Sequence, residues 1–332
     1  MKVLIMMRFF LKMMLVLTLS ATAFADKKVV IIAGVGGLEK FEKRFFAQSS
    51  KLRKILINQY DYAPEDVRML VEQAADSLSR YSNSNASTIR KTFQDLSKNT
   101  SAKDELIVFL LGHGTHDGEW AKFNIEGPDL RDIDFSGFLD GLNVGQLVFI
   151  NMASASGSFL EKLSGDGRIL ISATNGAVEK NATRFAAHFI AALEKGNEAD
   201  LNKDNTLSVT EAFIYARDNL IHDYQEKKQL RAEHPLLDDN GDGKGTETPD
   251  LLNGDGAIAS RFNFMQERGG DVVERTAKAV PVSPELARKR KSVLDKIKKL
   301  QTRKEEMDQE EYYNDLEKLM LQLARINADS KK

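Results

Sequence analysis

Short runs of apolar, β-branched residues alternate along the chain with segments whose apolar residues recur at helical spacing. The apolar runs, which predict buried strands, are Lys28–Ala33, Val67–Val71, Leu106–Leu111, Leu147–Ile150 and Ile169–Ile171. The helical patterns are Phe41–Gln59, Ser87–Leu96, Asp134–Leu142 and Lys180–Leu193. Strands that are apolar throughout and alternate with helices predict an α/β fold, in which a mostly parallel sheet lies between two layers of helices. In such folds, functional residues lie at the carboxyl ends of the strands.

The first 25 residues are typical of a secretory signal peptide. Arg8 and Lys12 form a basic start, and the apolar run Met13–Leu19 is too short to span a bilayer. Ala23-Phe24-Ala25 has the small-x-small pattern of a cleavage site. We therefore expect a periplasmic or secreted protein with no membrane span after cleavage. An N-terminal membrane anchor is the alternative interpretation.

The C-terminal part of the chain predicts a separate helical unit. We place a globular domain at 26–265, a linker at 266–282 and a helical hairpin, or coiled-coil tail, at 283–332. Basic residues dominate the first half of the tail and acidic residues the second half, so that two antiparallel helices would attract each other. Such a tail makes self-association possible. One long solvated helix is the alternative.

Composition excludes several classes of function. The chain has 332 residues and a net charge of −2, which gives no reason to expect nucleic acid as a partner. Charged residues make up 29% and hydrophobic residues 42%, as in ordinary globular proteins. The chain has no cysteine, and so it has no disulfide, no thiolate metal site and no cysteine nucleophile.

Two polar motifs end consecutive predicted strands. Gly112-His113-Gly114 follows one strand, and Asn151-Met152-Ala153-Ser154-Ala155-Ser156-Gly157-Ser158 follows the next. A histidine and a hydroxyl on neighbouring strand ends can meet across a cleft as base and nucleophile. The small residues around them would let a substrate backbone approach, and backbone amides could hold an oxyanion.

These motifs resemble the active-site segments of the caspase-like cysteine peptidases, and most closely the legumain and GPI-anchor transamidase family. Ser172-Ala173-Thr174 and the stretch from Glu179 to Phe189 also resemble the segment that follows the family's nucleophile. The resemblance covers about residues 27–230. It implies a caspase-like three-layer α/β/α sandwich, with the family's catalytic histidine at His113 and its catalytic cysteine at Ser154.

The replacement of the family's cysteine by Ser154 changes the expected function. A serine hydroxyl is a weak nucleophile and needs a well-placed base, usually oriented by a third group. Met152 stands where legumain has its acidic specificity residue, which argues against an asparagine-selective pocket. We therefore expect a non-catalytic peptidase homologue that binds a peptide or protein partner. The alternatives are a hydrolase with Ser154 as nucleophile and His113 as base, and a scaffold that makes its contacts through the tail.

A twelve-residue segment fits the calcium loop of an EF-hand. Oxygen ligands would come from the first, third, fifth, seventh, ninth and twelfth positions. These residues are Asp200, Asn202, Asp204, Thr206, Ser208 and Glu211. Asn205 replaces the usual glycine at the sixth position, where a positive φ is required. We expect a structural Ca²⁺ site here, and a metal-free polar turn is the alternative.

A second segment begins with the same ligand spacing. Asp238, Asn240 and Asp242 occupy its first, third and fifth positions. Its twelfth position is Pro249, so no bidentate glutamate closes the loop. Calcium binding and a plain loop of Gly and Asp residues both remain open at this stage. In the caspase-like resemblance, an ordered loop here would shape the wall of the cleft.

Overall fold

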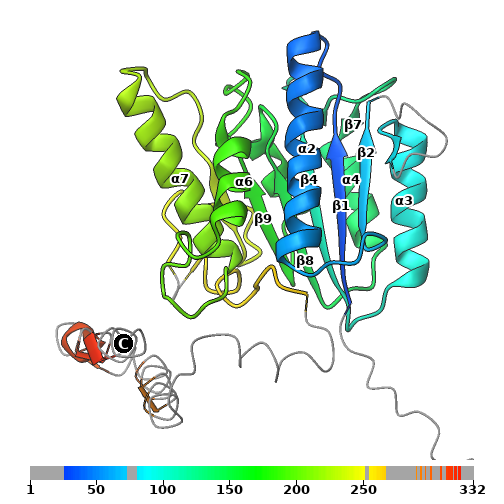
Figure 1. Cartoon of the computed structure of the whole chain (residues 1–332). Coiled ribbons are helices and arrows are strands. Elements are labelled where there is room, and N and C mark those ends of the chain that lie inside the picture. The colour runs from blue at the N-terminus through cyan, green and yellow to red at the C-terminus, as the bar shows by residue number, and fades with distance from the viewer. Residues whose placement is uncertain are drawn as a thin grey trace, which may run out of the picture.

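A mostly parallel sheet of seven strands forms the centre of the computed structural model, which describes residues 26–72, 81–250 and 254–266 and scattered positions between 289 and 322 (Figure 1). The strand order is β10-β9-β8-β4-β1-β2-β3. The strands are β1 (Lys27–Ala33), β2 (Val67–Val71), β3 (Tyr81–Asn83), β4 (Glu105–Leu111), β8 (Gln146–Asn151), β9 (Arg168–Ser172) and β10 (Leu236–Asp238). Only β10 is antiparallel to its neighbour.

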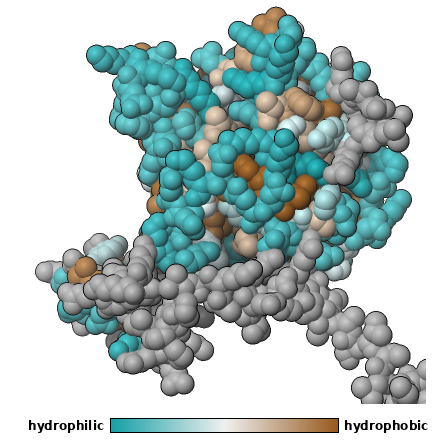
Figure 2. Space-filling view, in the orientation of Figure 1, coloured by the Kyte–Doolittle hydropathy of each residue, from teal (hydrophilic) through white to brown (hydrophobic). Residues whose placement is uncertain are grey.

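Helices cover both faces of this sheet. The helices are α2 (Glu39–Gln59), α3 (Ala86–Asn99), α4 (Asp132–Asp140), the short η1 (Ser156–Phe159) and α5 (Leu160–Leu163), α6 (Phe185–Lys195) and α7 (Val209–Glu226). The layer of α2, α6 and α7 faces the viewer in Figure 1. Figure 2 shows that its outer side is mostly hydrophilic, with hydrophobic patches near α2. These amphipathic helices therefore bury one face against the sheet.

The alternation of side chains along each strand builds two separate cores. In β1, Val29 and Ile31 pack with the layer of α2, α6 and α7, whereas Val30 and Ile32 pack with α3, α4 and α5. The same division holds along β4 and β8. Since both faces are buried, the strands are apolar throughout, and the predicted mixed α/β fold with a mostly parallel sheet is confirmed.

Several local expectations differ from the structure. Helix α3 starts one residue before Ser87, because the side chain of Asn85 caps it by accepting a hydrogen bond from the Thr88 amide at 2.9 Å. Helix α6 starts at Phe185 rather than at Lys180. Apart from these differences, a small antiparallel sheet of β5 (Gly114–His116), β6 (Ala121–Phe123) and β7 (Leu130–Arg131) follows β4.

The predicted terminal segments lie largely beyond the described residues. The expected signal peptide, 1–25, lies outside them entirely, as does nearly all of the expected linker. In the tail, the scattered described positions are mostly helical, and Val293, Leu300 and Tyr312 are buried. The hairpin at 283–332 stays a prediction.

Candidate functional site

The polar motifs that follow β4 and β8 meet at the carboxyl edge of the sheet, because these two strands are direct neighbours. Ser154 is 2% exposed. Its Oγ donates a hydrogen bond to the Gly114 carbonyl oxygen and accepts one from the Gly114 amide, each at 3.0 Å. The hydroxyl is therefore held by the backbone of Gly114, and no hydrogen bond joins it to His113 among the described residues.

The ring of His113 packs between two aromatic side chains of α2. Its centroid lies 4.6 Å from that of Phe41 and 5.1 Å from that of Phe45, and both contacts are edge-to-face. Burial lowers the pKa of His113, and the nearby positive charge of Arg44 lowers it further. The imidazole is thus mainly neutral at pH 7.

Arg44 brings a positive charge to the same place. Its guanidinium lies 4.9 Å from the ring centroid of Phe41 and 5.1 Å from that of Phe45. Its Nε is buried and has no hydrogen-bond partner among the described residues. Burial lowers the pKa of Arg44, and the charge of Glu233 opposes that effect. Arg44 can therefore accept an anionic group beside His113.

A cavity of about 220 Å³ opens next to this aromatic cluster, at the carboxyl ends of β1 and β2. It is lined by Ala33, Gly34, Glu42, Lys43, Phe45, Phe46, Val71 and Glu72. Small-molecule sites usually enclose roughly 300–1,000 Å³. A cavity of this size with a charged rim is suited to one side chain of a larger ligand.

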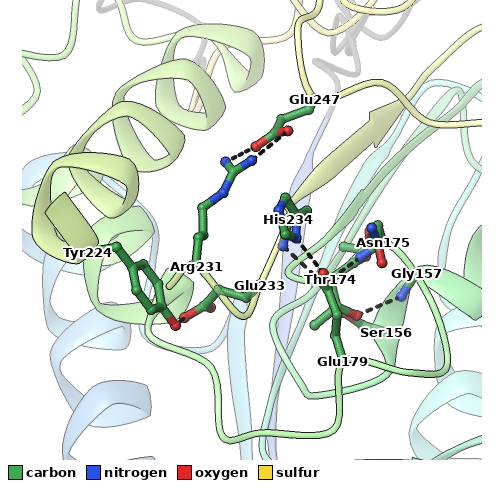
Figure 3. Close-up of polar contacts among 11 residues, drawn as sticks. Ser156, Gly157, Thr174, Asn175, Glu179, Tyr224, Arg231, Glu233, His234 and Glu247 are labelled. Carbon is green, nitrogen blue, oxygen red and sulfur yellow. Dashed lines mark hydrogen bonds and ion pairs between the residues drawn. The ribbon is translucent and has the colours of Figure 1, made fainter. Parts of the chain in front are cut away.

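The hydroxyl of Ser156 is also committed to the backbone. Ser156 is fully buried, and its Oγ accepts hydrogen bonds from the amides of Ala173 and Thr174 at 3.0 and 3.2 Å. Figure 3 shows the adjacent bond, in which the Gly157 amide donates to Thr174 Oγ1. A Cβ on Gly157 would lie 2.4 Å from the Thr174 carbonyl oxygen, so the loop requires glycine here. These contacts join the end of β8 to the end of β9.

The carboxylates of Glu179 and Glu233 hold the loops that flank the site (Figure 3). Glu179 accepts hydrogen bonds from the amides of Asn175 and His234 at 2.9 and 3.0 Å and contacts His234 Nδ1. Glu233 accepts from both amides at the start of α6, those of Arg184 and Phe185, and from the Tyr224 hydroxyl. The 174–184 loop is therefore joined to the segment that leads into β10.

The first expected calcium loop connects α6 to α7 and has a defined conformation. Asn205 has φ of 69°, as its sixth position in the loop requires, and its amide donates to Asp200 Oδ2 at 2.9 Å. Asp204 Oδ1 accepts from the Thr206 amide at 2.8 Å. Asn202 Oδ1 accepts from the Asp204 amide at 2.8 Å.

The last loop residue, Glu211, is 1% exposed and forms a capping box with Ser208 at the start of α7. Its carboxylate accepts from the amides of Leu201 and Asn202 and from the amide and hydroxyl of Ser208. Among the described residues, no group of three or more His, Cys, Asp or Glu side chains is arranged to hold a metal ion. Calcium binding at this loop stays a prediction.

The second expected loop lies at the end of β10 that is far from His113. The strand runs from Leu236, which pairs with Ser172 at the end of β9, to Asp238, which pairs with Leu170 in the middle of β9. The loop that follows reaches the turn before β9, where the Gly243 amide donates to Ser164 Oγ. Asn240 Oδ1 accepts from the Asp242 amide at 2.9 Å. The loop thus lies at the opposite edge of the sheet and does not form a wall of the cleft, contrary to the expectation from the sequence.

Comparisons with known proteins find similarity to solved structures. No protein-family model and no curated protein matches the chain. The crystal structure of protein GSU0716 from Geobacter sulfurreducens is similar to it, with a TM-score of 0.44 and 12% sequence identity, over 73% of this chain and 100% of that chain. Within the described residues, no helix is both long and apolar enough to cross a membrane.

Sequence reasoning missed the residues that shape the site around His113. Arg44 carries a detectable signal, since it stands between Phe41 and Phe45 on the apolar stripe of α2, where a charge is unexpected. Glu179 and Glu233 carry no such signal. The contacts of Glu233 with Arg184 and of Glu179 with His234 join residues about 50 positions apart in sequence, and only the fold brings them together.

Proposed function

We propose that this protein is an exported, caspase-like peptidase homologue that binds an extended peptide segment of a partner without cleaving it. The observation that carries the proposal is the pair of hydrogen bonds between Ser154 Oγ and the backbone of Gly114. The parallel arrangement of β4 and β8, which places His113 and Ser154 on neighbouring strand ends, supports the caspase-like assignment.

The chemistry of hydrolysis is disfavoured by these two hydrogen bonds. A serine nucleophile must give its proton to a base, yet the Ser154 proton is directed at the Gly114 carbonyl oxygen rather than at His113. The Gly114 amide, the donor best placed to stabilise an oxyanion next to this histidine, is occupied by the same hydroxyl. These two hydrogen bonds deprive the transition state of hydrolysis of a base and of an oxyanion donor, and they leave the cleft intact.

Three features of the cleft favour a peptide as the ligand. β5 follows His113 directly and is an edge strand of its small sheet, so an added segment can pair with the part of β5 beyond Gly114. The cavity beside Phe45 fits one side chain. The side chain of Arg44 is only partly buried, so its guanidinium can donate a charge-assisted hydrogen bond to a carboxylate. We therefore propose a partner segment that presents Asp or Glu beside an apolar or polar side chain.

The reactivity of Ser154 is tested by treating the purified protein with a fluorophosphonate probe, which labels nucleophilic serines. We expect no labelling above that of Ser154→Ala and His113→Ala, with and without Ca²⁺. Labelling of the wild type that is lost in both variants would instead establish the alternative, a hydrolase with Ser154 as nucleophile and His113 as base.

Peptide binding is tested with a fluorescent library of peptides with a fixed central Asp, measured by anisotropy. We expect Arg44→Gln to weaken binding by about 10-fold to 100-fold, as loss of a hydrogen bond between charged groups predicts. Arg90→Gln, which changes an exposed arginine on α3, is the matched control. Equal affinities for Asp-centred and Lys-centred peptides would contradict an anionic anchor at Arg44.

We propose further that the 200–211 loop binds Ca²⁺ as a structural ion. Its spacing of oxygen ligands, the positive φ of Asn205 and the start of α7 at the ninth position support this. Ca²⁺ at about 100 times its Kd should raise the Tm by on the order of 5 °C, and Asp200→Asn should reduce that rise. Asp218→Asn, an exposed change on α7, is the control. A Tm that is the same with Ca²⁺ and with EGTA would exclude a structural ion.

A further inference from the structure

The loop that follows β10 is held in a fixed conformation by its neighbours. Leu237 and Thr246 pair across its base through two backbone hydrogen bonds, of 2.9 and 2.8 Å. The Gly243 amide donates to Ser164 Oγ at 3.0 Å, which attaches the loop to the turn before β9. Gly241 and Gly243 have φ of 82° and 73°, a conformation that favours glycine. The positions of the oxygen atoms in this loop are therefore well defined.

One oxygen atom in this loop is buried without a partner. Asp238 is 1% exposed, and its Oδ1 accepts a hydrogen bond from the Gly241 amide at 3.3 Å. Its Oδ2 is buried and has no hydrogen-bond partner among the described residues. A buried carboxylate oxygen without a partner is destabilising unless a proton or a cation compensates its charge. The loop thus contains an unused ligand atom that points to a missing positive charge.

The surrounding charges are also negative. Asp239 and Asp255 are 3% and 9% exposed, and within the described part of the chain none of these carboxylates forms an ion pair with Lys or Arg. Asp239 is satisfied, since its oxygens accept from the amides of Gly256, Ile258 and Ala259. Asp242 belongs to the same turn, and its Oδ1 accepts a hydrogen bond from the Lys244 amide at 2.7 Å.

We propose that this loop binds one Ca²⁺ through Asp238 Oδ2, Asn240 Oδ1, the Asp242 carboxylate and the Lys244 carbonyl oxygen. These are the first, third, fifth and seventh positions of a calcium loop, and water completes the coordination because Pro249 occupies the twelfth. Two carboxylates, an amide oxygen and a backbone oxygen form a set of hard ligands without nitrogen or sulfur, which favours Ca²⁺ over Zn²⁺.

Binding here would stabilise the edge of the sheet and the contacts beyond it. Asp239, the neighbour of Asp238, caps the turn at 256–259. The same turn receives hydrogen bonds from Thr210 at the start of α7, through its hydroxyl to the Gly256 carbonyl oxygen and its amide to that of Ala259. The site is thereby connected to the 200–211 loop. It does not depend on the proposed peptide-binding function.

The test is equilibrium dialysis of the purified protein against ⁴⁵Ca²⁺, combined with thermal unfolding. Asp242→Asn is the main variant, because Asp242 is exposed and its change leaves the fold intact. Asp238→Asn removes the central ligand, and Asp218→Asn is the matched control. We expect Asp242→Asn to weaken one class of Ca²⁺ site by at least about tenfold, as loss of one of two charged ligands predicts.

Ca²⁺ binding at the loop after β10 can be measured separately from Ca²⁺ binding at the 200–211 loop. In an Asp200→Asn background, one Ca²⁺ per chain should remain and should be lost on adding Asp242→Asn. Retention of the same stoichiometry and affinity in Asp242→Asn and Asp238→Asn would overturn the proposal, whatever Asp200→Asn does. Equal competition by Mg²⁺ at micromolar concentration would overturn the assignment to Ca²⁺.

Discussion

Gly114→Ala is expected to destabilise the protein by about 3–5 kcal/mol, although it adds only one methyl group. A Cβ at Gly114 would lie 2.3 Å from the Ser154 carbonyl oxygen and 3.0 Å from that of Lys122, and neither backbone atom can move independently. The ends of β4 and β8 must then separate, which breaks both hydrogen bonds between Gly114 and Ser154. Overpacking costs about 1–3 kcal/mol, and each lost hydrogen bond adds about 1 kcal/mol. Urea unfolding measures the difference.

Gly137→Ala is the matched control for this substitution. Gly137 lies within α4, and a Cβ there would meet no atom within 4 Å. Alanine is favoured over glycine inside a helix, so this variant should be more stable by about 0.5–1 kcal/mol. If Gly114→Ala were as stable as the wild type while Gly137→Ala behaved as expected, Ser154 would not be held against Gly114.

The pattern of apolar residues in the sequence predicts most of this fold, because the strands are apolar on both faces. The predicted boundaries of β2 agree with the structure, and those of β4 and β8 differ from it by one residue at one or both ends. The short strand β3 was missed, since its three residues, Tyr81–Asn83, are mostly exposed and carry no apolar signal. Local pattern therefore predicts elements that are buried and long, and fails for short edge strands.

The candidate site was predictable only in part. The motifs around His113 and Ser154 indicate that two strand ends meet, and the pairing of β4 with β8 places them side by side. The orientation of the Ser154 hydroxyl depends on the backbone of a residue 40 positions away, which no local pattern encodes. The same reason explains why Glu233, a carboxylate in an irregular segment, could not be recognised as the cap of α6.

Burial raises the pKa of Glu233 above its ordinary value of 4.5. This shift determines how the effect of a Glu233 substitution on stability varies with pH. The folded protein holds this proton to a higher pH than the unfolded chain does. The stabilisation that comes from protonating Glu233, as distinct from the hydrogen bonds that its carboxyl group accepts, is therefore present below pH 4.5 and is lost as the pH rises through the folded-state pKa. Glu233→Gln cannot titrate, so the wild type should lose more stability than this variant as the pH rises from 4.

Glu233→Ala is expected to lower the free energy of unfolding at pH 7 by about 3–5 kcal/mol, because three buried donors lose their acceptor. The donors are the amides of Arg184 and Phe185 and the Tyr224 hydroxyl, and Glu233 itself is 2% exposed. The substitution also removes a negative charge from the N-terminus of α6. Tyr224→Phe removes only one donor and should cost about 1 kcal/mol. Urea unfolding of both variants, with the exposed Glu226→Ala as control, measures these values. A loss no larger in Glu233→Ala than in Tyr224→Phe would mean that Glu233 does not cap α6.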